Sequence, residues 1–195
     1  TLATHVAGYW AHCGHAVMLG DIDRQQSARQ WLARRPASLP RIRGWEVDRD
    51  DVVRPPKGTT HVVLDTPAGL HGKRLRQVLK RVDWMLVPLA PGVFDREATA
   101  AFVDALTEWR LAGRTRLGLV GMRTDERTLA AGEMRDFVRR LDVPLLTTLR
   151  PTQNYLHLAA RGLTLFDLPP ARVARDLAQW QPLCEWLDTP AQASP

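Results

Sequence analysis

The chain has 195 residues, of which 45% are apolar and 25% charged, and its formal net charge is +6. A chain of this length buries about 70% of its unfolded surface, so it needs no disulfide framework. Its two cysteines, Cys13 and Cys184, have no metal-binding or redox spacing. No apolar run approaches the roughly 18 residues of a membrane span. These features exclude a small disulfide-rich scaffold, and we expect a cytoplasmic protein without a membrane partner.

Short apolar runs alternate with amphipathic segments along the whole chain. In chain order we expect a helix at 1–13, a strand at 16–19, a helix at 27–35, a short strand at 45–47, a strand at 61–64 and a helix at 71–82. A strand at 84–89, a helix at 95–111, a strand at 117–122, a helix at 128–141, a strand at 143–146 and helices at 153–160 and 173–187 follow. This alternation predicts a three-layer α/β fold with a mostly parallel sheet. We expect one domain over residues 1–188 and a flexible tail over 189–195.

Two carboxylates, Asp21 and Asp23, follow the strand expected at 16–19. In open parallel sheets, ligands bind beyond the carboxyl ends of the strands, so both acids are expected at the ligand crevice. A carboxylate pair there can hold Mg²⁺ through water and can orient an attacking water molecule. The alternative is a polar helix entry in which Asp23 is the N-cap.

A third acid, Asp65, ends the apolar strand expected at 61–64. An acid at such a strand tip can reach the hydration shell of a magnesium ion, which is the Walker B pattern. Thr66, Pro67 and Gly69 then form a loop that can respond to a terminal phosphate. Two acidic strand tips separated by a helix indicate a nucleotide site much better than either tip alone.

Four sequence segments resemble the motifs of one family. They are DIDRQQSARQW at 21–31, DTPAG at 65–69, VPLAPGVFD at 87–95 and AARGLTLFD at 159–167. In this order they span nearly the whole chain, which resembles the ParA/MinD family of deviant-Walker P-loop ATPases (SIMIBI type). The resemblance is closest to small ParA proteins that lack an N-terminal DNA-reading domain. Arg24 and Gln26 stand where the family usually has proline and glycine.

The resemblance implies a role for each acid and four nucleotide contacts. Asp23 would position the hydrolytic water, while Asp21 and Asp65 would hold Mg²⁺ through water. The nucleotide contacts would be Thr1 near the α-phosphate, Thr66 in the loop after Asp65, and Met122 and Arg123 beside the adenine. Met122 replaces the family's usual asparagine, which puts that last contact in doubt.

The implied activity is ATP-dependent partitioning. The protein would dimerise with ATP, bind nucleoid DNA non-specifically, and hydrolyse ATP when a ParB-like or ribbon-helix-helix centromere-binding protein docks, so that plasmid or chromosomal DNA is segregated. The DNA contacts implied are Arg150, Arg161, Arg172 and Arg175. Two alternatives stay open: positioning of a protein cargo by the same mechanism, and a non-catalytic dimerisation or regulatory module.

The family's glycine-rich phosphate loop, its lysines and its central first strand would all precede Thr1. A triphosphate is attracted by loop N–H groups and lysines and is repelled by carboxylates. We therefore expect the sequence from Thr1 onward to be inactive without that loop.

Two further sets of residues admit more than one interpretation. His5, His12 and His15 cluster near the first helix, but helical spacing puts them on different sides, which disfavours a metal site. Five basic residues at 73–81 form one face of an amphipathic helix, which is either a solvated surface or a binding surface.

Overall fold

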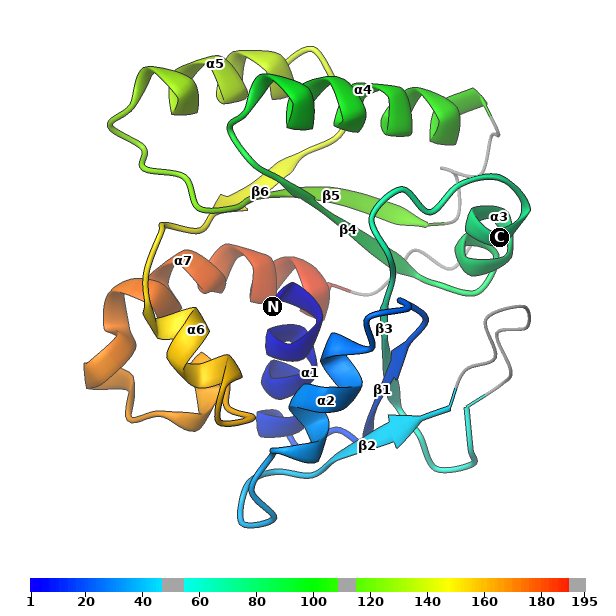
Figure 1. Cartoon of the computed structure of the whole chain (residues 1–195), viewed down its shortest axis with the longest axis vertical. Helices are drawn as coiled ribbons and strands as arrows, with labels where there is room; N and C mark the ends of the chain where they lie inside the picture. Colours follow the sequence, from blue (N-terminus) through cyan, green and yellow to red (C-terminus); the bar gives the residue numbers. More distant parts are fainter. Residues whose placement is uncertain (47–54, 109–114, 190–195) are drawn as a thin grey trace. The chain divides into compact units, whose positions relative to one another are not determined.

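The computed structural model describes residues 1–46, 55–108 and 115–189, which fall into two compact units (Figure 1). The first unit comprises Thr1–Arg74 and Gln153–Leu177, and the second comprises Leu75–Thr152 and Ala178–Pro195. Each unit contains a three-stranded parallel sheet, with strand order β2-β1-β3 in the first and β4-β5-β6 in the second. Two helices, α3 (Gly72–Leu79) and α7 (Pro170–Asp188), run from one unit into the other.

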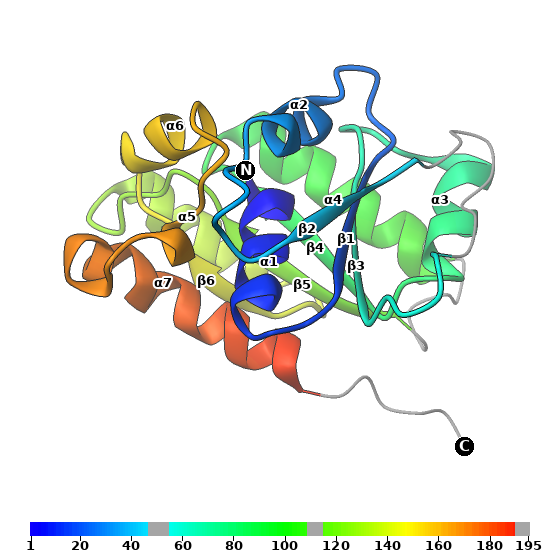
Figure 2. The same cartoon turned by 90° about the horizontal axis from the view of Figure 1, so that it is seen from below.

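The first unit is organised around β1, whose first four residues are buried. Its elements are α1 (Leu2–His12), β1 (Val17–Asp21), α2 (Ser27–Ala33), β2 (Ile42–Trp45), β3 (His61–Asp65), α6 (Asn154–Ala159) and the 3₁₀ helix η2 (Leu165–Asp167). Helix α1 packs against β1 and β3 (Figure 2), and α2 packs against β1 and β2. A strand buried in this way is typical of the centre of a parallel sheet.

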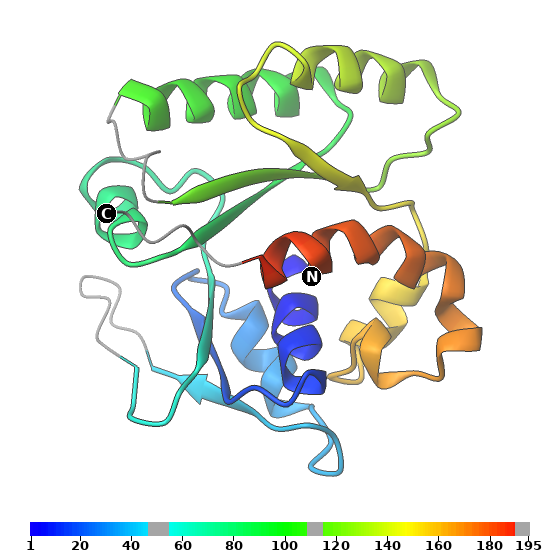
Figure 3. The ribbon, with the colours of Figure 1, turned by 180° about the vertical axis from the view of Figure 1, so that it is seen from behind.

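The second unit is built on β5, which lies between β4 and β6. Its elements are β4 (Trp84–Leu89), α4 (Val93–Glu108), β5 (Arg116–Gly121), α5 (Leu129–Val138) and β6 (Leu145–Thr148). Helices α4 and α5 lie side by side over one face of this sheet, as both Figure 1 and Figure 3 show. The buried core between these helices and the sheet contains Leu89, Val103, Leu119, Met134, Val138 and Val143.

The alternation of parallel strands and helices predicted from the sequence is confirmed, with three differences. The strands form two sheets instead of one, and β3 and β4 are the outer strands of those sheets within the described ranges. Strand β2 begins earlier than the strand expected at 45–47 and spans Ile42–Trp45, because buried Ile42 pairs with Val17 of β1; residue 47 lies outside the described residues. Strand β6 begins at Leu145 and not at residue 143, and its register with β5 shifts between Leu119 and Val120. The last three residues of the helix expected at 95–111 lie outside the described residues.

A buried ion pair joins the two segments of the first unit. The guanidinium of Arg35 donates to both carboxylate oxygens of Asp167, at 2.9 Å each, and the two side chains are 4% and 0% exposed. His12 Nε2 lies 2.8 Å from Asp167 Oδ1, and the N–H and hydroxyl of Thr164 donate to Oδ2 at 2.7 and 2.8 Å. We call this group the Asp167 clasp. It ties α1, the end of α2 and η2 together.

The Asp167 clasp makes the free energy of unfolding depend on pH in the acidic range. Burial raises the pKa of Asp167, but hydrogen bonds from Arg35, His12 and Thr164 outweigh burial and lower this pKa to about 2. A depressed carboxyl pKa contributes stability that is present above the unfolded value, near 3.9, and is lost as the pH falls towards 2. We expect the free energy of unfolding to fall by about 2 kcal/mol between pH 5 and pH 2 because of this group.

Denaturant titrations from pH 5 to pH 2, with ¹³C NMR of the Asp167 carboxyl, measure this dependence. Asp167→Asn should remove most of it, and it should destabilise the protein at pH 7 because Arg35 is left buried without its partner. The matched control is Asp136→Asn, since Asp136 pairs with Arg139 on the exposed surface at 3.0 Å. An Asp167 carboxyl that titrates near pH 4 would contradict the prediction.

Candidate functional site

The two acidic strand tips predicted from the sequence lie next to each other. Asp21 ends β1 and Asp65 ends β3, and the two residues are partners in the register of this parallel pair. The N–H of Ile22 continues the pairing by donating to the Asp65 carbonyl at 3.0 Å. Because the carboxyl ends of parallel strands share one edge of a sheet, both acids lie at the edge where such sheets bind ligands.

The Asp21 carboxylate is fixed by backbone N–H groups. Its Oδ1 accepts from the N–H of Asp23 at 3.0 Å, and its Oδ2 accepts from the N–H groups of Ala28 and Arg29 at 2.9 and 3.3 Å. Asp21 therefore satisfies N–H groups in the first turn of α2, which otherwise have no partner in the helix. The capping alternative predicted from the sequence named the wrong acid, because the Asp23 carboxylate accepts instead from the N–H of Gln25, at 3.0 Å.

The turn that carries Asp23 has one unusual backbone conformation. Gln26, the residue before α2, has a φ of 48°, in the left-handed region that glycine adopts readily. This is the position where the resembling motif has glycine, so the structure gives a physical reason for that preference. The turn places half-exposed Asp23 beside Asp21.

Electrostatics confirm that three acids share this end of the first unit. Burial has the largest effect on the pKa of Asp65 and raises it, and the charges of Asp21 and Asp23 raise it further. The pKa of Asp65 is therefore raised, which means that its surroundings destabilise the ionised carboxylate. A bound cation would stabilise that ionised form.

These donors suit a magnesium ion that keeps much of its hydration. Within residues 1–46, 55–108 and 115–189, no group of three or more His, Cys, Asp or Glu side chains could hold a metal ion by itself. Two carboxylates with water and phosphate oxygens are the usual protein environment of Mg²⁺ beside a nucleotide. The N-terminus of the 11-residue helix α1 adds N–H groups and a partial positive charge that favour an anion.

The remaining predicted nucleotide contacts are divided between the units. Thr1 and Thr66 belong to the first unit with the acids, and Thr66 is half-buried directly after β3. Met122 and Arg123 belong to the second unit, directly after β5, where the N–H of Met122 donates to the Leu89 carbonyl at 2.8 Å. Exposed Arg123 has a φ of 50°, so it forms a tight turn at this strand end. Thr1 and Thr66 thus share a unit with the acids, whereas the contacts expected beside the adenine do not.

The four arginines expected to contact DNA are divided between the two units. Arg161, Arg172 and Arg175 are exposed on the first unit, after α6 and in the first turns of α7. Arg150 belongs to the second unit, is half-buried, and donates its backbone N–H to Gln179 Oε1 at 3.0 Å. All four arginines stay candidates for contacts to DNA phosphates.

The sequence did not point to Arg35, Gly162 or Thr164. Gly162 accepts a hydrogen bond from Arg35 Nη1 at 3.3 Å, and Thr164 contributes to the Asp167 clasp. The one signal in the sequence was the motif at 159–167, in which an apolar run ends in aspartate.

No helix in the described part of the chain is long and apolar enough to cross a membrane.

Comparisons with known proteins agree with this geometry. No family model matches the chain. It is similar to the "Maintenance of carboxysome distribution protein A" of Halothiobacillus neapolitanus, with 28% identity over 55% of this chain and 50% of that protein. The protein of the same name from Gloeobacter kilaueensis is 25% identical over 88% of this chain and 80% of its own length. The match to the first of these relatives thus spans only half of that protein.

Solved structures extend the similarity to the fold. A plasmid partition protein of Borrelia burgdorferi bound to AMPPNP has a TM-score of 0.72 at 11% identity, over 95% of this chain and 93% of that one. MinD in the MinC:MinD cell division complex of Aquifex aeolicus has a TM-score of 0.70 at 13% identity, over 100% of this chain and 91% of that one. At such low identity these likenesses concern the fold alone.

Proposed function

We propose that this chain, which has the fold of ParA/MinD-type ATPases, is the nucleotide-binding domain of an ATP-driven positioning protein. The observation that carries the proposal is the register pairing of Asp21 with Asp65 at the carboxyl ends of β1 and β3. Nothing in a parallel sheet requires two partly buried acids at adjacent strand ends, and their mutual repulsion costs stability. A non-catalytic module could use Asp21 to cap α2 but would gain nothing from Asp65 beside it.

Each acid has a distinct part in the proposed chemistry. Asp21 and Asp65 would hold the water ligands of Mg²⁺, and when bound the ion would neutralise charge on the phosphates of ATP. Asp21 is suited to this because three N–H groups fix its carboxylate, yet each oxygen can accept further bonds. Asp23 would orient the attacking water, because its carboxylate is half-exposed on the turn beside Asp21.

The cargo that the comparisons favour is a protein assembly. Two curated relatives maintain the distribution of carboxysomes, which are protein bodies and not DNA segments. We therefore rank protein cargo ahead of the plasmid or chromosome segregation expected from the sequence. Segregation, with a ParB-like or ribbon-helix-helix partner, is the second candidate, favoured by the fold shared with the Borrelia plasmid partition protein. In both cases a homodimer formed with ATP would hold nucleoid DNA as its track, through Arg161, Arg172 and Arg175.

Gene deletion separates the two cargoes. We expect deletion to cluster a protein assembly that is otherwise spaced along the nucleoid, and to leave plasmid loss per generation unchanged. Electron tomography of intact cells measures the first quantity and a plasmid-retention count measures the second. Complementation with the Asp23→Ala variant should fail to restore the spacing. Normal spacing together with accelerated plasmid loss would reverse the ranking of the two candidates.

A further inference from the structure

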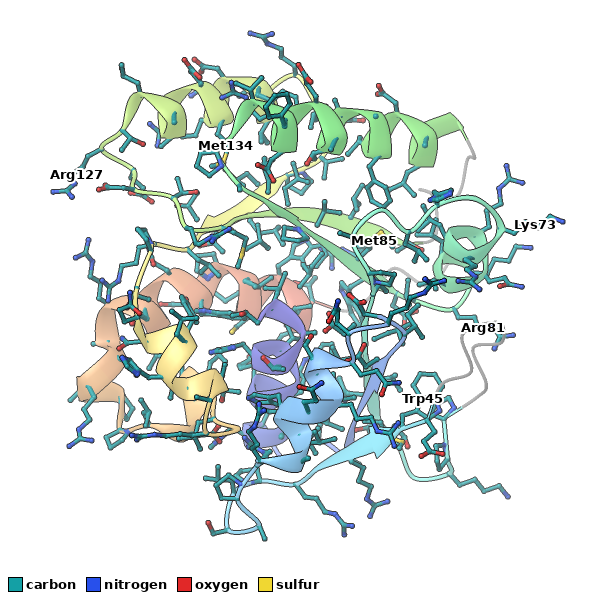
Figure 4. The ribbon with its side chains drawn as sticks, viewed as in Figure 1. Trp45, Lys73, Arg81, Met85, Arg127 and Met134 are labelled. Carbon is teal, nitrogen blue, oxygen red and sulfur yellow. The ribbon has the colours of Figure 1, made fainter. Side chains whose placement is uncertain are left out.

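Helix α3 carries a dense and exposed set of positive charges. Lys73, Arg74, Arg76, Lys80 and Arg81 are all exposed, while Leu75, Val78 and Leu79 are buried. No acidic residue occurs between Thr66 and Val82 in the sequence. Figure 4 shows Lys73 and Arg81 pointing outward from the two ends of this segment.

Helical geometry places these basic residues on one continuous face of the helix. At 100° per residue, the five cations and Gln77 occupy about 160° of arc, and the three buried residues lie on the opposite side. The helical turn continues past Leu79, because Lys80 and Arg81 donate their N–H groups to the carbonyls of Arg76 and Val78 at 3.2 and 2.9 Å. The polar face of α3 therefore offers only cations and one amide.

Contacts on the buried side of α3 and at its carboxyl end fix the position of this basic face. The buried Thr115 hydroxyl lies 3.0 Å from the Leu79 carbonyl and 3.1 Å from the Val82 carbonyl, so it anchors the carboxyl end of the helix. Leu75, Val78 and Leu79 are at most 4% exposed, so they have no apolar surface to insert into a bilayer. The face can therefore attract an anionic surface but cannot insert into a lipid one.

The charge spacing fits a double-helical phosphate backbone. From Lys73 to Arg81 the helix rises by about 12 Å, a length over which duplex DNA carries about seven negative charges. Lys73, Arg76 and Lys80 follow one another at i, i+3 and i+7, so they form one stripe along the helix. The exposed face has no aromatic ring for stacking on unpaired bases, which favours a double helix over a single strand.

We propose that the basic face of α3 is a second nucleic-acid-binding surface, which contacts the backbone of a double helix without reading its sequence. The proposal deepens the proposed function, on which it rests for the role of DNA as a track. This surface shares no residue with the set formed by Arg161, Arg172 and Arg175.

Salt-dependent binding to a 30-base-pair duplex tests the proposal, with the protein as its gene encodes it. The test variant is Lys73→Gln/Arg76→Gln/Lys80→Gln, which removes one stripe of charge and keeps good helix formers. Its affinity at 100 mM salt should fall at least tenfold, and the slope of log K against log salt should decrease by about 2 to 3. The loss should be the same for duplexes of unrelated sequence. Circular dichroism and ATP turnover should stay as in the parent.

The matched control removes the same charge elsewhere. Arg41→Gln/Arg43→Gln/Lys57→Gln replaces three exposed cations of the first unit and should leave affinity within about threefold. Arg161→Gln/Arg172→Gln/Arg175→Gln tests the other surface, so its failure to weaken binding would count against the proposed function and not against α3. Equal losses in the α3 variant and the matched control would overturn the proposal.

Competing ligands identify the partner. Duplex DNA and duplex RNA should both displace the labelled DNA from the parent protein, and their ratio shows which double helix is preferred. Single-stranded DNA, polyglutamate and phosphatidylserine vesicles should compete poorly. If vesicles or polyglutamate bind the parent better than duplexes do and lose that binding in the α3 variant, the surface serves a membrane or an acidic protein and the proposal is wrong.

Discussion

Replacing Asp23 with alanine is expected to lower ATP turnover by roughly a hundredfold or more while ATP binding is largely retained. Asp23 lies on the turn between β1 and α2, beside Asp21, and its proposed task is to orient water. Loss of a group that acts mainly in the transition state lowers kcat and leaves ground-state binding nearly unchanged. Phosphate release and nucleotide titration, on the protein as its gene encodes it, measure the two quantities.

Asp23→Asn provides the control for the structure of the turn. The asparagine oxygen can still accept the hydrogen bond from the N–H of Gln25, now 3.0 Å from Asp23 Oδ1, so the turn is preserved while the negative charge is lost. Both variants should lose turnover if the carboxylate acts on water. If Asp23→Asn retains normal turnover, Asp23 shapes the turn and has no part in the reaction.

The largest expected loss of stability from a single methyl group is at Gly162. A Cβ at this position would lie 2.5 Å from the carbonyl carbon of Arg34 and 2.5 Å from the backbone nitrogen of Arg35, and backbone atoms cannot move aside as a side chain can. The φ of Gly162 is also 67°, which disfavours any residue with a Cβ. We expect Gly162→Ala to destabilise the protein by about 3 kcal/mol or more, measured by urea unfolding.

Gly14→Ala separates the conformational penalty of a positive φ from the steric clash expected at Gly162. Gly14 has a φ of 84°, and apart from its chain neighbours no atom lies within 4 Å of the place that a Cβ would occupy, so alanine there meets the conformational penalty alone. That penalty is about 1 kcal/mol. A Gly162→Ala variant no less stable than Gly14→Ala would mean that the contact between residues 34–35 and Gly162 is looser than the structure shows.

The sequence predicted those parts of the fold and site that depend on local pattern. A run of apolar residues that ends in an acid identifies a buried strand and its carboxyl end, so Asp21 and Asp65 could be placed correctly from the pattern alone. Helix α5 could be predicted because Thr128 precedes it, and its side chain accepts from the N–H of Ala131 at 3.3 Å. These signals lie within a few residues of the features that they identify.

Features that depend on distant partners could not be predicted. The sequence interpretation offered Asp23 as the cap of α2, whereas the path of the chain from β1 to α2 gives this role to Asp21. Arg35 looks like a solvated end of a helix until Asp167, 132 residues later, is seen beside it. The position of β2 was also missed, because Ile42 pairs with β1 across the connection that contains α2 and its own neighbours give no strand signal.

The Asp167 clasp also sets an order of events during synthesis. The first unit is assembled from two separate stretches of chain, and Arg35 leaves the ribosome 132 residues before Asp167 does. At the usual 5–20 residues per second, the interval is roughly 7–26 s. Most of the second unit is made within that interval and can pack its own core. The first unit must wait with a charged arginine in a position that becomes buried, so a nascent chain halted before residue 167 should be a preferred substrate for chaperones and proteases.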